Sequence, residues 1–413
     1  MKRTINFLFV LCFFLSAVFA QSSEVLTGIE VLKENNFRQL QGLKIGLITN
    51  QTGVDNSFNS TIDLLHKTKN VELVALFGPE HGVRGDIDAG KKIKSFTDQK
   101  TGLPVYSLYG SNKKPSAKML KNIDALVYDI QDIGCRSYTY ISTMGLAMEA
   151  AAENGIKFFV LDRPNPLGGN RIEGNLPEEK YMSFISRYKI PYIYGLTCGE
   201  LALLINDEGW LEKNLKCDLS VIKMKSWSRN TNITNYQNLW IPTSPHIPHK
   251  ETSYYYPATG ILGELRSLFN IGVGYTLPFE MILSEQIDAL QLAEKLNKKF
   301  NTNDVVFRPT FVKPYYSGFK GKQLTGIQIY IKNFKMENLM WIQFSVLEEI
   351  LKQRPELTKK IAINSNESKM FDKAIGTNKI REFIIQNRFD KIKSYLQKDI
   401  EQFRKLSEKY FLY

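Results

Sequence analysis

Four polar segments of the chain carry side chains that could act as acids, bases or ligand-binding groups. Together they hold carboxylates, a histidine, arginines and amides, which are the groups that move protons and bind polar or anionic ligands. Each segment follows an apolar run of strand length, so the four would meet at one edge of a parallel sheet, where α/β proteins place their sites. The segments are NQTG (50–53), GPEHGVRG (78–85), DIQDIGCR (129–136) and DRPNPLGG (162–169).

The first acid–base candidate is Glu80, which stands beside His81 in a loop rich in glycine and proline. A fixed loop of this kind can present a general acid or base, although a glutamate there can also cap a neighbouring helix. Asp129 and Asp132 could supply a second carboxylate, and enzymes that hydrolyse a glycosidic bond usually use a pair of carboxylates. For Asp129 and Asp162, capping at the strand ends is an equal alternative.

The residues do not predict a metal or a nucleotide cofactor. His246 and His249 could join His81 in a three-histidine metal site, but the prolines around them exclude the helix that would align their side chains. The chain has no P-loop and no G-x-S-x-G, H-E-x-x-H or C-x-x-C motif. Trp240 and the tyrosines at 254–256 could stack on a sugar or belong to the core.

Continuous apolar runs predict the strands that must position these residues, because runs without alternation are typical of buried parallel strands. A helix over Ser142–Asn154, ended by Gly155, joins two strands into a β–α–β unit, and a helix over Thr197–Asp207 continues the pattern. We therefore predict a Rossmann-like, doubly wound α/β domain over 21–260. Its strands are predicted at Leu43–Thr49, Val71–Phe77, Ile123–Asp129, Ile156–Asp162 and Leu219–Met224.

After about Gly260 the sequence changes to segments separated by prolines. A strand pair is predicted at Val305–Val312 and Leu324–Lys332, and long helices are predicted at Asn338–Gln353 and Asp390–Lys405. These elements indicate a smaller α+β domain over 261–413.

The first 20 residues have the pattern of a secretory signal peptide. Lys2 and Arg3 precede the apolar run Phe7–Phe19, and Ala20 fits the small residue before a cut. A lipoprotein anchor at Cys12 is disfavoured, because the residue before it is not small. We therefore expect export to the periplasm or beyond, with the mature chain beginning near Gln21, and no later stretch is long and apolar enough to span a membrane.

The composition is that of an ordinary globular protein. Among 413 residues, 43% are hydrophobic and 23% are charged, which excludes a collagenous or disordered chain. Removal of the leader lowers the formal net charge by two, from +12 to +10, and leaves Cys135, Cys198 and Cys217, which are expected to be buried free thiols. Positive charge favours an anionic partner such as cell-wall polymer, whereas export argues against nucleic acid.

Six stretches of the chain resemble the exo-β-N-acetylmuramidases of the NamZ type, a family once catalogued as a domain of unknown function. The resemblance covers the chain from about residue 25 to its end, and the motifs are far more specific together than any one alone. They are GLITNQTG (46–53), LFGPEHGVRGDID (76–88), YDIQDIGCRSYTY (128–140), LDRPNPLGG (161–169), YGLTCGE (194–200) and PFE (278–280).

This resemblance implies an active cleft between the two domains and release of N-acetylmuramic acid from the non-reducing end of peptidoglycan fragments. The family's catalytic glutamate falls on Glu80, which would protonate the leaving oxygen with a pKa raised by partial burial. Arg84 or Arg136 could bind the carboxylate that distinguishes muramic acid. The candidate catalytic residues are Glu80, His81 and Asp132, and the candidate substrate-binding residues are Asn50, Gln51, Arg84, Asp129, Arg136, Tyr138, Asp162, Asn165 and His246.

Three positions depart from the family pattern. The chain has His246 in the Pro-rich loop where asparagine is usual, and Ile271 and Val273 where glutamate and arginine are usual.

The identity of the second catalytic group stays open, because a 2-acetamido sugar can supply its own nucleophile, with Asp132 only orienting it. A non-catalytic protein that binds wall fragments and a metal-dependent wall esterase or amidase are the alternative functions.

Overall fold

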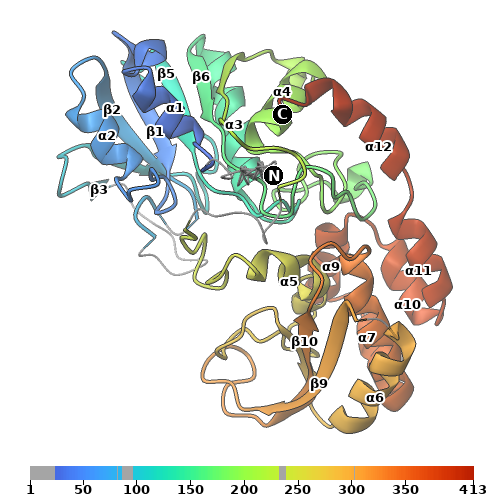
Figure 1. The fold of residues 1–413 in the computed structure, drawn as a ribbon. Coiled ribbons are helices and arrows are strands. Elements are labelled where there is room, and N and C mark those ends of the chain that lie inside the picture. The colour runs from blue at the N-terminus through green and yellow to red at the C-terminus, as the bar shows by residue number, and fades with distance from the viewer. Residues whose placement is uncertain (1–23, 81, 86–95, 232–238, 302) are drawn as a thin grey trace, which may run out of the picture.

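The computed structural model describes residues 24–80, 82–85, 96–231, 239–301 and 303–413. The predicted leader at 1–20, with Cys12, and the catalytic candidate His81 lie outside these described residues. Figure 1 shows a larger domain built on one sheet and a smaller domain beneath it, with its own sheet and a group of helices. The predicted α/β domain and the smaller α+β domain are both confirmed.

The larger domain contains a seven-stranded sheet in the order β3-β4-β2-β1-β5-β6-β7. All neighbouring pairs are parallel except β3 with β4. The five predicted strands agree with the structure to within two residues at each end, while β3 and β4 are additions at one edge. The strands are β1 (Lys44–Thr49), β2 (Glu72–Gly78), β3 (Phe96–Thr97), β4 (Pro104–Ser107), β5 (Ala125–Asp129), β6 (Lys157–Leu161) and β7 (Asp218–Ile222).

Different helices cover the two faces of this sheet. On one face α1 (Gly28–Glu34) and α2 (Thr61–Lys67) pack on the strands, and on the other face α3 (Tyr140–Asn154) and α4 (Cys198–Asp207) do so. Because successive side chains of a strand point to opposite faces, an unbroken apolar run fills both cores. All three cysteines among the described residues are buried and unbridged, as expected.

The smaller domain contains a three-stranded antiparallel sheet in the order β8-β10-β9. The predicted strand pair is confirmed, and β8 is a third, four-residue strand that was not predicted. None of the helices in the described part of the chain has the length and apolar character of a membrane span. The elements are α5 (Thr252–Thr259), β8 (Met281–Ser284), α6 (Ala289–Phe300), β9 (Val305–Val312), β10 (Leu324–Ile331), α7 (Leu339–Gln353), α8 (Glu356–Ala362), α9 (Asn366–Ile375), α10 (Lys379–Ile385), α11 (Phe389–Leu396) and α12 (Ile400–Ser407).

The single helix predicted over Asp390–Lys405 is wrong, because the segment is two helices, α11 and α12. Asp399 between them has a φ of 66°, which is the left-handed region and interrupts the helix. The break turns α12 away from the small domain, and Figure 1 shows it running back beside α4. Ile400 and Phe403 of α12 pack into the same core as α3 and α4, so the end of the chain ties the two domains together.

Candidate active site

The polar segments after β1, β2 and β5 meet at the carboxyl edge of the large sheet. Because β1 lies between β2 and β5, the residues Thr49, Gly78 and Asp129 end three adjacent parallel strands. The chain proceeds from β1 to β2 in one direction and from β5 to β6 in the other. A reversal of this kind leaves a crevice outside the strand ends, and ligands of open α/β sheets bind there.

Glu80 lies two residues after the end of β2 and is half-buried. The side chain of Tyr109 lies beside the Glu80 carboxylate, and burial together with that carboxylate raises the pKa of Tyr109 to about 12. Tyr109 therefore stays protonated near neutral pH and remains a hydrogen-bond donor. Tyr109 is therefore a neighbour that can donate a hydrogen bond to Glu80 at the sheet edge.

The loop that carries Glu80 folds back on itself. A β carbon on Gly78 would lie 3.0 Å from the backbone nitrogen of Val83, and Gly82 has a φ of 79°. A β carbon on Gly85 would lie 2.6 Å from the side chain of Gln51. The glycines therefore allow the loop after β2 to approach the segment after β1.

Asp132, from the segment after β5, is a second carboxylate at this edge and is 5% exposed. Its Oδ2 accepts hydrogen bonds from the hydroxyl of Tyr194 and from the backbone N–H of Gly134, the latter at 2.7 Å. Its Oδ1 accepts none from any described residue. Burial raises the pKa of Asp132 to about 6, although these donors oppose the rise. Asp132 therefore has one oxygen held by the protein and one buried oxygen without a hydrogen-bond partner among the described residues.

The Pro-rich segment 242–246 forms a wall of this site. Gln51 Nε2 donates to the carbonyl oxygens of Pro242 at 2.8 Å and Thr243 at 3.1 Å, while Gln51 Oε1 is buried without a partner among the described residues. The Tyr140 hydroxyl donates to the carbonyl oxygen of Thr243 at 2.6 Å, and the Tyr138 hydroxyl lies 2.7 Å from Thr243 Oγ1. Two tyrosines and an amide therefore fix this wall against the sheet edge.

Tyr140 also shows that the candidates lie close together. The Tyr140 side chain lies next to Asn50. Burial raises the pKa of Tyr140, and the nearby charge of Glu80 makes a smaller contribution to this rise. Asn50 Oδ1 accepts hydrogen bonds from the backbone N–H of Thr52 at 2.9 Å and from its hydroxyl at 2.6 Å. The structure thus brings together Asn50, Gln51, Glu80, Asp132 and Tyr138.

His246 extends the wall toward the small domain. It is half-buried, and its Nε2 lies 3.2 Å from the hydroxyl of Tyr316. The two rings are stacked, with centroids 6.3 Å apart and an interplanar angle of 21°. His246 therefore lies at the boundary of the site, between the two domains.

Asp129 and Asn165 are engaged by the protein itself. Asp129 Oδ1 accepts from Arg163 Nε at 2.5 Å, and its Oδ2 accepts from Arg163 Nη2 at 3.0 Å and Thr61 Oγ1 at 2.5 Å. The amide of Asn165 pairs with the carbonyl oxygen of Leu196 and the backbone N–H of Leu167, both at 2.9 Å. Asn165 thus fixes the backbone beneath the site, whereas Asp129 forms a buried ion pair with Arg163 and does not cap a strand end through a backbone N–H of any described residue.

Both arginines bind other groups of the protein through their guanidinium groups. Arg84 forms a two-bond pair with Asp98, at 2.8 and 3.0 Å, and this pair holds the pKa of Asp98 at about 2. Arg136 is fully buried and donates at 2.7 Å to the carbonyl oxygens of Asn175, Ile190 and, in α9, Ile375. The structure therefore assigns Arg136 to the joint between the domains and not to ligand binding.

Asp162 is fully buried and accepts four hydrogen bonds. The donors are the hydroxyls of Thr197 and Tyr413, both at 2.7 Å, and the backbone N–H groups of Gly199 at 2.8 Å and Arg163 at 3.0 Å. Burial raises its pKa to about 6. Asp162 thus fastens the start of α4 and the C-terminal tyrosine to the end of β6.

We expect Asp162→Ala to lower the free energy of unfolding by about 3 kcal/mol, because its buried donors lose their acceptor. Tyr413→Phe removes only one of these hydrogen bonds and should cost about 1 kcal/mol. Urea unfolding at pH 7 measures both differences. An Asp162→Ala protein with the wild-type urea midpoint would contradict this structural role.

Three contributors to the site were not singled out as site residues from the sequence: Tyr109, Tyr194 and Thr243. Tyr194 begins the YGLTCGE motif, so the motif itself carried a signal. Tyr109 follows the unpredicted strand β4, and Thr243 lies more than one hundred residues from the tyrosines that it contacts. Tertiary contacts alone bring these two side chains to the sheet edge.

The chemistry that this edge offers is that of two carboxylates with tyrosines beside them. Among the described residues no group of three or more histidine, cysteine, aspartate or glutamate side chains is arranged to hold a metal ion. In the described part of this edge, Glu80 and Asp132 are carboxylates that can donate or accept a proton, with amides and hydroxyls around them to bind a polar ligand.

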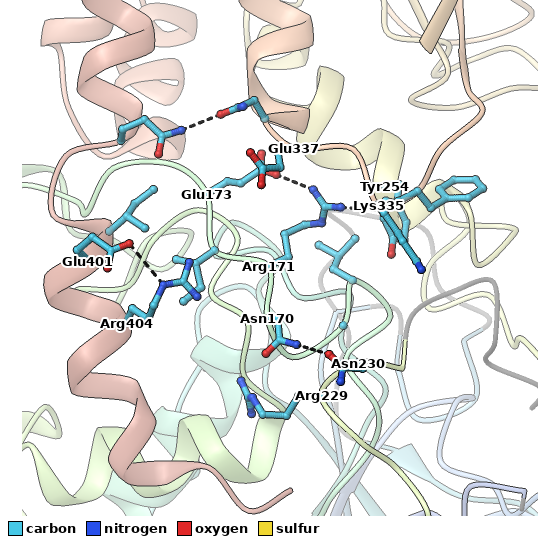
Figure 2. A pocket seen from close by; sticks show the side chains of 17 residues that line it. Asn170, Arg171, Glu173, Arg229, Asn230, Tyr254, Lys335, Glu337, Glu401 and Arg404 are labelled. Atoms are coloured by element: carbon cyan, nitrogen blue, oxygen red, sulfur yellow. Dashed lines mark hydrogen bonds and ion pairs between the residues drawn. The ribbon is translucent and has the colours of Figure 1, made fainter. Parts of the chain in front are cut away.

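A separate pocket of about 530 Å³ lies where the segments after β6 and β7 meet α12 (Figure 2). Its Arg171 donates to Glu173 at 2.7 Å and to the carbonyl oxygen of Phe334 at 2.8 Å. Its Arg229 forms an ion pair with Glu200 at 2.8 Å. Because Arg171 binds groups of both domains and segments of both line the pocket, the pocket belongs to the joint between the domains.

Comparison with known proteins gives one family for both domains. Residues 45–251 match the family model described as exo-beta-N-acetylmuramidase NamZ, N-terminal, and residues 254–413 match the C-terminal model of the same description. The chain is 42% identical over 395 residues to the peptidoglycan beta-N-acetylmuramidase NamZ of Bacillus subtilis (strain 168), and the match covers 95% of this chain and 92% of that protein.

Two crystal structures of DUF1343 family proteins from Bacteroides fragilis NCTC 9343 are similar to the chain. One is 53% identical, with a TM-score of 0.89, and the match covers 94% of this chain and 99% of that one. The other is 28% identical, with a TM-score of 0.69, and the match covers 95% of this chain and 99% of that one. The fold of both domains is thus shared with solved structures.

Proposed function

The chain belongs to the exo-β-N-acetylmuramidase NamZ family, and from this premise we propose that it is a glycosidase of peptidoglycan that releases N-acetylmuramic acid from the non-reducing end of wall fragments. The observation that carries the proposal is the family match over both domains, at 45–251 and 254–413. The first of these ranges includes the sheet edge with Glu80 and Asp132.

Glu80 is the proposed general acid. Cleavage of a glycosidic bond needs a proton on the departing oxygen, and the protonated carboxyl of Glu80 supplies it as the bond to C1 breaks. The Glu80 carboxylate then takes a proton from the water that adds to C1. Tyr109 lies beside this carboxyl and is a hydrogen-bond donor for its ionised state.

Asp132 is the proposed partner of the 2-acetamido group of the substrate. Its Oδ2 is held by Tyr194 and Gly134, while its Oδ1 is buried without a partner among the described residues and is the oxygen that we assign to the acetamido N–H. An acetamido group held in this way can attack C1 with its carbonyl oxygen as the leaving oxygen departs, and water then opens the resulting ring. Asp132 thus orients and stabilises the substrate's own nucleophile.

The direct test uses purified wild-type protein. We expect release of N-acetylmuramic acid from the N-acetylmuramic acid–N-acetylglucosamine disaccharide, and of 4-nitrophenol from 4-nitrophenyl β-N-acetylmuramide, with equal rates in the presence of EDTA. A folded protein that hydrolyses neither compound would exclude this function and favour a wall-fragment binding protein. Activity that EDTA abolishes would favour a metal-dependent wall enzyme.

Export of the chain stays a prediction from its first 20 residues. The run Phe7–Phe19 after Lys2 and Arg3 supports it, and a periplasmic or secreted location would give the protein access to wall fragments. The first residue of the mature protein, expected to be Gln21, would check it.

A further inference from the structure

Exposed aromatic rings gather on one part of the small domain. Phe311 is 59% exposed, Tyr315 is 68% exposed and Tyr316 is 50% exposed. Phe311 and Tyr315 line a pocket of about 660 Å³, together with Tyr275. We call Tyr275, Phe311, Tyr315 and Tyr316 the aromatic surface. A concentration of apolar rings facing solvent is typical of a binding surface.

The backbone holds these rings in place. The N–H of Tyr315 donates to the carbonyl oxygen of Gly274 at 2.7 Å. Gly274 has a φ of +94°, and a β carbon there would lie 2.3 Å from the carbonyl oxygen of Tyr316. The rings of Tyr275 and Tyr315 are stacked, with centroids 5.8 Å apart and planes 11° apart. The surface is therefore formed before a ligand arrives, which lowers the entropic cost of binding.

The aromatic surface continues the wall of the candidate active site. Tyr316 contacts His246 through its hydroxyl, at 3.2 Å, and through ring stacking. His246 stands three residues after Thr243, which binds Tyr138 and Tyr140 at the edge that holds Glu80. A chain molecule that leaves the sheet edge along this wall would reach the aromatic surface next.

Two lysines give this surface a charge. Lys313 and Lys320 line the same pocket, and neither forms an ion pair with another described residue. The neighbouring Lys322 is different, because it pairs with Glu285 at 2.8 Å. A suitable ligand would therefore combine flat apolar faces with carboxylates. Pyranose rings offer apolar C–H faces to aromatic rings, and muramic acid residues carry carboxylates that lysine can bind.

We propose that the aromatic surface binds the glycan on the reducing-end side of the cleaved bond, beyond the first sugar that leaves. This inference rests on the proposed function, because it takes peptidoglycan glycan as the ligand. The rings of Tyr275 and Tyr315 contact the sugar faces, and Lys313 and Lys320 contact carboxylates of the glycan. Longer glycans are then better substrates than the disaccharide.

The test compares two substrates that both begin with N-acetylmuramic acid. They are the disaccharide with N-acetylglucosamine and the tetrasaccharide that repeats this unit. We expect wild-type kcat/KM to be about three- to tenfold higher for the tetrasaccharide. Tyr315→Ala should lose most of this advantage while its disaccharide kcat/KM is unchanged.

Tyr330→Ala is the matched control, because Tyr330 is a 43% exposed tyrosine on β10 that does not line the pocket. This variant should keep the full advantage of the tetrasaccharide. A wild-type protein without chain-length preference, or a Tyr315→Ala protein that keeps the preference, would overturn the inference. Dimerisation of the wild type that Tyr315→Ala abolishes would also overturn it, by assigning the surface to a second copy of the chain.

The two proposals can fail separately. Turnover of the disaccharide with no chain-length effect rejects the aromatic surface and leaves the muramidase function intact. If no saccharide is hydrolysed, calorimetric titration with the tetrasaccharide still tests the surface. Binding that is weaker in Tyr315→Ala than in Tyr330→Ala supports it, and equal or absent binding rejects it.

Discussion

Glu80→Gln is expected to lower kcat for the disaccharide by about 10²- to 10⁴-fold, because an amide cannot give a proton to the departing oxygen. The loss should depend on the leaving group. N-acetylglucosamine leaves poorly without a proton, whereas 4-nitrophenolate is stable as an anion. On 4-nitrophenyl β-N-acetylmuramide the loss should therefore be at least about tenfold smaller. Steady-state kinetics on both substrates measure the difference.

Glu72→Gln is the matched control for this experiment. Glu72 begins β2, the strand that Glu80 follows, and it is exposed at the opposite end of the sheet. Its substitution should leave kcat within about twofold of the wild type for both substrates. An equal loss on both substrates in Glu80→Gln, with the fold intact, would contradict the acid role and indicate a role in substrate binding.

The sheet and its functional edge were predictable because one physical signal produced both. Buried parallel strands are continuous apolar runs, and such a run ends where the chain leaves the apolar core between sheet and helices. The polar residues at those ends, such as Asn50, Glu80 and Asp132, therefore mark the edge of the sheet in the sequence itself. Knowledge of strand order was not needed, since parallel strands all present their carboxyl ends on one side.

The roles of individual polar residues were not predictable in the same way. Arg136 lies in a motif at that edge, but its guanidinium binds carbonyl oxygens as far away in the chain as Ile375. Asp162 lies at a strand end, but the last residue of the chain, Tyr413, is one of its donors. A sequence pattern gives the type and position of a side chain, while its partners depend on contacts between distant segments.

The break at Asp399 is a further example. The polar pattern over Asp390–Lys405 fits one helix, and helix propensity gives no strong reason for an interruption there. In the folded chain Ile400 and Phe403 are buried against the large domain, apart from the core that α11 joins. Burial of these side chains in two different cores outweighs the continuity of one helix.

Asp132→Asn is expected to lower kcat/KM by about 10²-fold or more, and to change the pH dependence of the activity. Only the ionised carboxylate can accept the acetamido N–H with full charge. Since burial raises the pKa of Asp132 from 3.8 to about 6, wild-type activity should rise with pH and be half-maximal near pH 6 on its acidic limb. Asp132→Asn should lose that limb, as pH profiles of kcat/KM would show.

Tyr194→Phe provides a second variant with a directional effect. The Tyr194 hydroxyl donates to Asp132 and lowers its pKa against the effect of burial. Without this donor the pKa of Asp132 rises further, so the acidic limb should move to higher pH while activity at the plateau is largely kept. An acidic limb that stays near pH 6 in both variants would assign it to another group.

The stability of Asp132→Asn separates its catalytic role from a structural one. A carboxyl whose pKa in the fold exceeds its unfolded value of 3.8 stabilises the fold at low pH, and this contribution is lost as the pH rises through about 6. At pH 8 the wild type therefore holds a buried charge at a cost, whereas asparagine is neutral and similar in shape. We expect Asp132→Asn to be at least as stable as the wild type in urea at pH 8, although it is nearly inactive. The charge of Asp132 then lowers the stability of the fold but is needed for activity. A negative charge at this position is what stabilisation of a reacting acetamido group requires.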